Sequence, residues 1–194
     1  MTSSRIRFTT ARQVFEAYPI AASDIKTPPL NAEWPLIFAK RLLSIRPAEA
    51  VAFCAYLLPR REAVWWGVSC VRVLERGEAD PALKAAEAWV RDPDETTRLA
   101  ALRIGGFANK RSPTTWLANA AAWSGGNINP GGPVPIPARP HLTAKTVNAA
   151  LILAIAQRAA SEQQPLMVAF AEAAIRFAEG GEARPIIPAS PAGR

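Results

Sequence analysis

Apolar side chains recur at spacings of three and four residues through most of the chain, and prolines or glycines interrupt this pattern at short intervals. Such spacing gathers apolar residues on one face of an α-helix. The 194 residues therefore predict an all-α fold, a compact bundle of about eight or nine helices. We expect a single helical domain at 31–179, preceded by a segment at 1–30 with a short helix and a proline linker. Residues 180–194 are expected to form a flexible tail.

Helix starts are predicted from capping residues. Residues 10–13 have the pattern of a capping box, so a short helix should begin at Ala11. Asp80-Pro81 and Asp92-Pro93 each place an N-cap acceptor before a proline of the first helical turn. Each pair predicts a new helix.

The most hydrophobic helix is predicted to have Thr143 as its cap and to run to about Ala160, and we expect it to lie at the centre of the bundle. A break should follow at 161–164, because Pro165 cannot donate to a continuous helical ladder. The last helix is therefore expected to begin at Pro165.

Residues 58–77, LPRREAVWWGVSCVRVLERG, predict one helix with two unlike faces. The apolar face contains Ala63, Val64, Gly67, Val71 and Leu74, and Trp66 falls near its boundary. The polar face contains Glu62, Ser69, Arg72 and Arg76, and Trp65 lies among them. Gly77 is a suitable residue for the helix end.

Trp65 has two interpretations at this position. Arginine stems could pack along its indole and leave the charged groups in water. Alternatively, it could be an exposed anchor for another protein, because Trp and Arg are enriched at interface hot spots. Arg60 and Arg61 are disfavoured by the helix dipole, which suggests a partner or a tertiary carboxylate. The candidate partner-binding residues are Arg61, Glu62, Trp65, Ser69 and Arg72.

A Gly- and Pro-rich stretch at 124–141 cannot form a helix or a central strand. Loops of this length are often functional or disordered. We expect its apolar part, 134–140, to lie across the helix surface. The loop is a second candidate site for a partner or ligand.

Catalytic groups are scarce in the sequence. His141 is the single histidine, so a zinc cluster or a histidine-dependent nucleophile is not expected. Cys54 and Cys70 should be buried thiols, offset too far along their helices for a disulfide. No glycine pattern suggests a phosphate site. These observations predict no cofactor, no metal and no enzymatic activity.

The net charge of +7 raises the possibility of nucleic-acid binding, but the arginines are scattered and form no basic arm. We therefore disfavour nucleic acid as a partner.

The N-terminus lacks the apolar run of a signal peptide, and no stretch is long enough to span a membrane. The sequence predicts a cytoplasmic protein.

Two resemblances extend this interpretation. Residues 92–105 resemble the second half of a HEAT-type helical repeat, which implies local helix pairing. The segment from Pro59 to Trp66, together with the helical layout, resembles an uncharacterised, mostly proteobacterial family associated with type VI secretion. That resemblance implies a helical accessory, adaptor or chaperone-like protein that binds another protein. The alternative is a small-molecule-binding or catalytic helical protein with the 124–141 loop as a lid.

Overall fold

The computed structural model describes residues 4–75 and 80–187, and these contain ten helices. The helices are α1 (Ala11–Ala17), α2 (Ala21–Asp24), α3 (Pro35–Ile45), α4 (Pro47–Leu57), α5 (Arg60–Leu74), α6 (Pro81–Arg91), α7 (Glu95–Phe107), α8 (Pro113–Ala122), α9 (Leu142–Ala156) and α10 (Ala160–Ala178). The all-α prediction is confirmed. The number exceeds the expected eight or nine, and the four-residue α2 lies where the sequence predicted only a proline linker.

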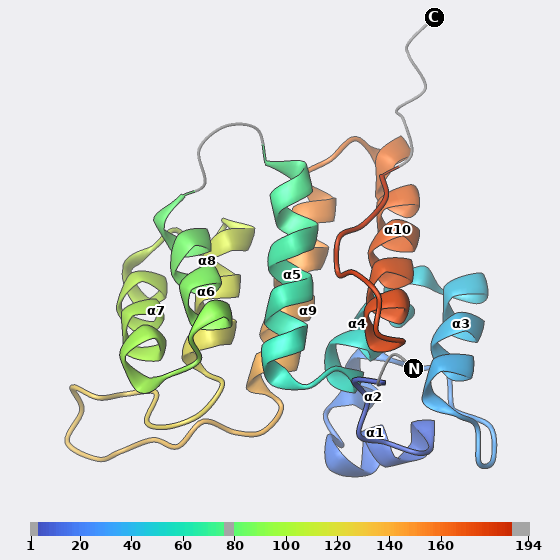
Figure 1. The fold of residues 1–194 in the computed structure, drawn as a ribbon, viewed down its shortest axis with the longest axis horizontal. Coiled ribbons are helices and arrows are strands. Elements are labelled where there is room, and N and C mark those ends of the chain that lie inside the picture. The colour runs from blue at the N-terminus through green and yellow to red at the C-terminus, as the bar shows by residue number, and fades with distance from the viewer. Residues whose placement is uncertain (1–3, 76–79, 188–194) are drawn as a thin grey trace, which may run out of the picture.

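The bundle is arranged around α5 and α9, which lie side by side at its centre (Figure 1). The consecutive helices α6, α7 and α8 pack against one another on one side, and α3, α4 and α10 form the other side. Helix α9 contacts α4, α5, α8 and α10, which confirms the prediction of a central helix at this position. Its N-cap is His141 and it ends at Ala156, so the predicted cap at Thr143 and the predicted end near Ala160 are wrong.

Two of the predicted helix starts are confirmed by their caps. The Thr10 hydroxyl accepts a hydrogen bond from the Gln13 backbone N–H at 3.4 Å, and the Gln13 side chain accepts from the Thr10 N–H. The Asp80 carboxylate accepts from the Leu83 N–H at 2.9 Å, ahead of α6. Both caps use local hydrogen bonds, which explains why sequence alone predicts them.

Two other predicted starts are wrong. The helix assigned to Asp92-Pro93 begins at Glu95, because Asp94 is its N-cap and accepts from the Thr97 N–H at 2.7 Å. The last helix begins at Ala160 and continues through Pro165. The carbonyl that Pro165 leaves without a helical donor belongs to Ser161, a solvent-exposed residue, so water can replace that donor.

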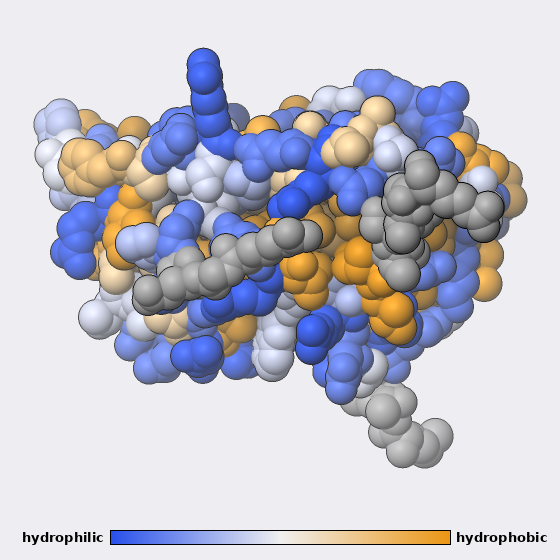
Figure 2. All heavy atoms as spheres, turned by 90° about the horizontal axis from the view of Figure 1, so that it is seen from above, coloured by the Kyte–Doolittle hydropathy of each residue, from blue (hydrophilic) through white to orange (hydrophobic). Residues whose placement is uncertain are grey.

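Both ends of the described chain lie on the bundle. Ala11 and Val14 of α1 are fully buried, and the Arg5 N–H donates to the Ala178 carbonyl at 3.0 Å. Residues 180–187, expected as part of a flexible tail, have a defined path in which Ala183 is 5% exposed. Residues 188–194, together with Arg76 and Gly77, lie outside the described part of the chain. Seen from above the view of Figure 1, the surface mixes hydrophilic and hydrophobic residues (Figure 2).

Candidate functional site

The inner face of α5 packs against neighbouring helices, among them α8, α9 and α10. The apolar residues Ala63, Val64, Gly67 and Val71 are buried, as the helical wheel predicts. Trp66 is fully buried too, and its indole Nε1 donates to the Phe170 carbonyl of α10 at 3.0 Å. The wheel places Trp66 near the boundary of the apolar face, and its burial shows that α10 covers this side of α5.

Gly67 allows α5 to approach α8 and α9 closely. A Cβ atom at this position would lie 2.8 Å from Leu117 Cδ2 and 3.1 Å from Val147 Cγ1. These distances are shorter than ordinary van der Waals contacts, so only glycine fits without movement of the neighbours. This close packing fixes the rotation of α5 about its axis and turns Trp65 outward.

Trp65 lies at the edge of a groove between α5 and α6. Its side chain is 45% exposed, and its ring lies 5.9 Å from the ring of Phe177. The groove has a volume of about 490 Å³ and is lined by Arg61, Trp65, Val68, Ser69, Arg72, Glu87, Val90 and Arg91. Four of the five residues predicted to bind a partner therefore line one groove. Glu62 is half-buried and is not among the lining residues.

Positively charged side chains outnumber negatively charged ones in the groove. Arg72 pairs with Glu87 across it, with Nε 3.0 Å from Oε1, and the two side chains are 44% and 16% exposed. Arg61 donates from Nε to the Val90 carbonyl at 2.7 Å, and Arg91 is exposed at the rim. Three guanidinium groups thus accompany one carboxylate, so the groove favours an anionic ligand.

The two arginines at the start of α5 bind the ends of neighbouring helices. Arg61 reaches Val90, in the last turn of α6, and Arg60 donates to the Ser124 carbonyl just after α8 at 2.6 Å. Carbonyl groups at helix C-termini lack intrahelical partners and favour cations. Both residues therefore have acceptors within the chain, and these are backbone carbonyls instead of the carboxylate that the sequence suggested as one possibility.

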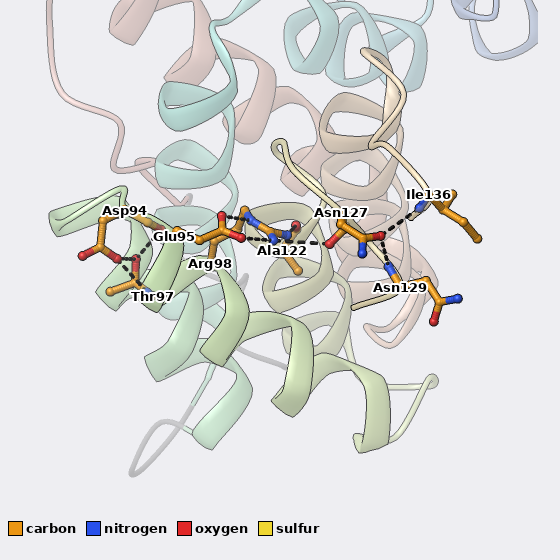
Figure 3. Close-up of polar contacts among 8 residues, drawn as sticks. All are labelled: Asp94, Glu95, Thr97, Arg98, Ala122, Asn127, Asn129 and Ile136. Atoms are coloured by element: carbon orange, nitrogen blue, oxygen red, sulfur yellow. Dashed lines mark hydrogen bonds and ion pairs between the residues drawn. The ribbon is translucent and has the colours of Figure 1, made fainter. Parts of the chain in front are cut away.

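The loop at 124–141 is held by Arg98 of α7 (Figure 3). The Arg98 side chain is 4% exposed and donates to the Glu95 carboxylate at 2.6 and 2.7 Å. It also donates to the carbonyls of Ala122 at 2.7 Å and Asn127 at 3.3 Å. The hydrogen bonds from Arg98 lower the pKa of Glu95. A buried cation with four acceptor contacts therefore fixes the start of the loop.

Asn127 shapes the loop itself. Its side-chain oxygen accepts from the N–H groups of Asn129 at 2.9 Å and Ile136 at 2.8 Å (Figure 3). Val134 and Ile136 are 67% and 47% exposed, so the expectation that this part lies across the helix surface is wrong. The proline-rich part is held by this side chain and by two backbone hydrogen bonds, from the Ile128 N–H to the Ile136 carbonyl at 2.8 Å and from the Ala138 N–H to the Gly126 carbonyl at 3.0 Å.

The potential nucleophiles lie in unreactive surroundings. Cys54 and Cys70 are free and buried, and burial raises the pKa of Cys54 to about 12 and that of Cys70 well above its usual value. Partial burial, together with Arg139 and Lys145, lowers the pKa of His141. Residues 4–75 and 80–187 contain no group of three or more His, Cys, Asp and Glu side chains that could hold a metal. In the same residues, no helix combines the length and apolarity that crossing a bilayer requires.

Residues 38–178 match the family described as "Family of unknown function (DUF6931)". The chain belongs to this family. No curated protein and no solved structure matched the chain. The part shared with DUF6931 runs from within α3 to the end of α10, so it contains the whole α5–α6 groove and the Arg98 network.

Sequence reasoning missed the α6 side of this groove and the role of Arg98. Glu87, Val90 and Arg91 join the site only through the packing of α6 on α5, which no local pattern encodes. The acidic Glu95 three residues before Arg98 was a local signal for their pairing. Nothing in the sequence placed Arg98 beneath a loop about 30 residues away.

Proposed function

We propose that this chain is a non-enzymatic helical module that binds another protein through the α5–α6 groove. The observation that carries the proposal is the half-exposed Trp65 at the edge of a groove that also holds Arg61 and Arg72. Tryptophan and arginine are enriched at interface hot spots.

The rigidity of α5 supports this role. Trp66 and Gly67, next to Trp65 in sequence, are fixed in the core. Binding through Trp65 therefore requires little ordering of the backbone, which lowers the entropic cost of association.

The charges define the partner's chemistry. Glu87 neutralises one of the three arginines that line the groove. A partner segment that brings a carboxylate toward Arg61 and Arg91, and an apolar side chain beside Trp65 and Val68, would complement both properties. Such a complex should weaken as the salt concentration rises.

The cellular setting we propose is a bacterial secretion system, in which the chain acts as an accessory, adaptor or chaperone-like protein. This rests on the resemblance of residues 59–66 to a family associated with type VI secretion. The genes that flank the coding sequence test it, because a secretion cluster is expected and unrelated housekeeping genes would contradict it.

The alternative, a small-molecule site beneath the 124–141 loop, has weaker support. A Cβ at Gly126 would lie 3.0 to 3.1 Å from guanidinium atoms of Arg98. The space directly beneath this glycine is thus filled by a side chain that is already hydrogen-bonded.

Affinity capture from the native host tests the groove. Wild type is compared with Trp65→Ala, Arg72→Ala and the matched control Phe107→Ala, which removes an aromatic side chain that is 92% exposed on α7. We expect one protein to be retained by wild type and Phe107→Ala, and lost with both groove variants. Capture of the same proteins by all four chains would disprove the proposed surface.

A further inference from the structure

The second half of the 124–141 loop presents an exposed, apolar run of prolines. Residues 133–137, 139 and 140 are all exposed, and the side chains of Val134 and Ile136 are 67% and 47% exposed. Figure 1 shows the loop at the edge of the molecule, beyond the ends of α6 and α7. None of its residues lines the α5–α6 groove. We call residues 133–140, PVPIPARP, the proline segment.

The sequence of the proline segment favours an extended backbone. Proline fixes its own φ at roughly −65°, and the residue before a proline is disfavoured in the α region. One of these two restrictions applies at every position of the segment except Ala138. The conformation that satisfies them is the polyproline II helix, which has three residues per turn. Pro137 and Pro140 are three residues apart, so their rings should lie on the same side of the segment.

Hydrogen bonds hold the proline segment in place from one edge. The Ile136 N–H donates to the Asn127 side chain at 2.8 Å, and the Ala138 N–H donates to the Gly126 carbonyl at 3.0 Å. Arg98, which is 4% exposed, donates to the Asn127 carbonyl and thereby ties this edge to α7. The segment is therefore ordered before any partner binds, which lowers the entropic cost of association.

The segment is unsuited to binding as an added β-strand. Four of its eight residues are prolines, which have no N–H to donate, and the N–H groups of Ile136 and Ala138 are already bonded. What remains for a partner is a row of apolar rings and side chains. Pro137-Ala-Arg-Pro140 has the PxxP spacing at which aromatic-lined grooves bind proline-rich segments.

We propose that the proline segment is the ligand of a second partner protein, one with an aromatic-lined groove that binds polyproline II helices. Pro137 and Pro140 pack against the aromatic rings of that groove, and Ile136 packs beside them. Arg139 is exposed and is the one charged residue at 124–140, so a groove with carboxylates at its edge complements it. With a different protein in the α5–α6 groove, the chain would bring two partners together.

Titration of the full chain into isotope-labelled SH3 and WW domains tests the proposal by nuclear magnetic resonance, because both domains have grooves of this kind. We expect saturable shifts of groove resonances. The Pro137→Ala/Pro140→Ala variant should raise the dissociation constant by about tenfold or more. The matched control Pro130→Ala, which removes an exposed proline ring from the same loop outside the segment, should bind like wild type. Circular dichroism should show that both variants keep the helix content of wild type.

Two further variants separate the contributions. Arg139→Glu should weaken binding by about threefold or more and reduce its dependence on salt, since a carboxylate at the groove edge would then repel the segment. Trp65→Ala should bind the domains like wild type, because the α5–α6 groove takes no part. Absence of shifts from every domain, shifts confined to residues outside the grooves, or equal affinity of wild type and the double proline variant would overturn the proposal.

Discussion

The two faces of α5 use adjacent residues of one type for different purposes. Trp66 is fully buried and donates a hydrogen bond to α10, whereas Trp65 is 45% exposed at the edge of the α5–α6 groove. The same division separates Cys70, which is buried, from Ser69, which lines the groove. The inner face determines how α5 sits in the bundle, and the outer face is thereby presented to solvent in a fixed orientation.

This contrast shows that residue type alone does not identify a site. Burial of an indole with its N–H satisfied stabilises the fold. An indole held half-exposed by rigid packing contributes little to stability and remains available to a partner. Variants that affect one face and leave the other unchanged test this division.

The largest effect is expected from Trp66→Ala. This variant removes a fully buried indole and its hydrogen bond to the Phe170 carbonyl. We expect the free energy of unfolding to fall by about 3–5 kcal/mol, as measured by urea denaturation. A loss as small as that of Trp65→Ala would contradict the assignment of Trp66 to the core.

Gly67→Ala should have the next largest effect. The added methyl group would lie 2.8 Å from Leu117 Cδ2. Overpacking costs about 1–3 kcal/mol, and the gain in helix propensity offsets about 1 kcal/mol of it. We therefore expect a net loss of about 1 kcal/mol in the same denaturation experiment.

Gly106→Ala is the matched control for Gly67. It lies in α7, and a Cβ there would meet no atom within 4 Å. This variant should gain about 0.5–1 kcal/mol. Equal effects at the two glycines would show that close packing does not fix α5.

Trp65→Ala should change stability by less than about 1 kcal/mol, because its side chain is half-exposed. Arg72→Ala breaks an ion pair with one partner 44% exposed, and such surface pairs contribute about 0–1 kcal/mol. Thermal and urea unfolding would measure both values. A loss above about 3 kcal/mol for either variant would indicate a structural role instead of a binding role.

The smallest stability change is expected from Ser69→Cys. The new thiol reports directly whether reagents in solution reach the groove. A thiol in the groove should react rapidly with a maleimide at neutral pH. The native Cys54 and Cys70 should stay unmodified until the protein unfolds, because burial raises their pKa values and blocks access. Slow labelling at position 69 would show that the groove is closed.

Local chemistry explains which parts of the fold the sequence could predict. The caps at Thr10 and Asp80 involve residues three apart, so their patterns were sufficient. The helix start predicted at Asp92 was wrong because Asp94 offers the same kind of N-cap two residues later. Which of the two residues caps the helix depends on where α7 packs. The helix start predicted at Pro165 was wrong because a proline near the start of a long helix removes only one hydrogen bond. The exposed Ser161 carbonyl can bind water instead.

The candidate site was half predictable for the same reason. The helical wheel placed Trp65, Ser69 and Arg72 on the outer face of α5, and they line the groove. Glu87 and Arg91 come from another helix, so their contribution depends on tertiary packing. The burial of Trp66 likewise depends on α10, a helix about 100 residues away in sequence.

The most direct test of the central claim measures the affinity of the captured partner for wild type, Trp65→Ala and Phe107→Ala by calorimetry. If the outer face of α5 binds that partner, Trp65→Ala should weaken the complex by about 30-fold or more while Phe107→Ala binds like wild type. Equal affinity for all three chains would contradict the claim.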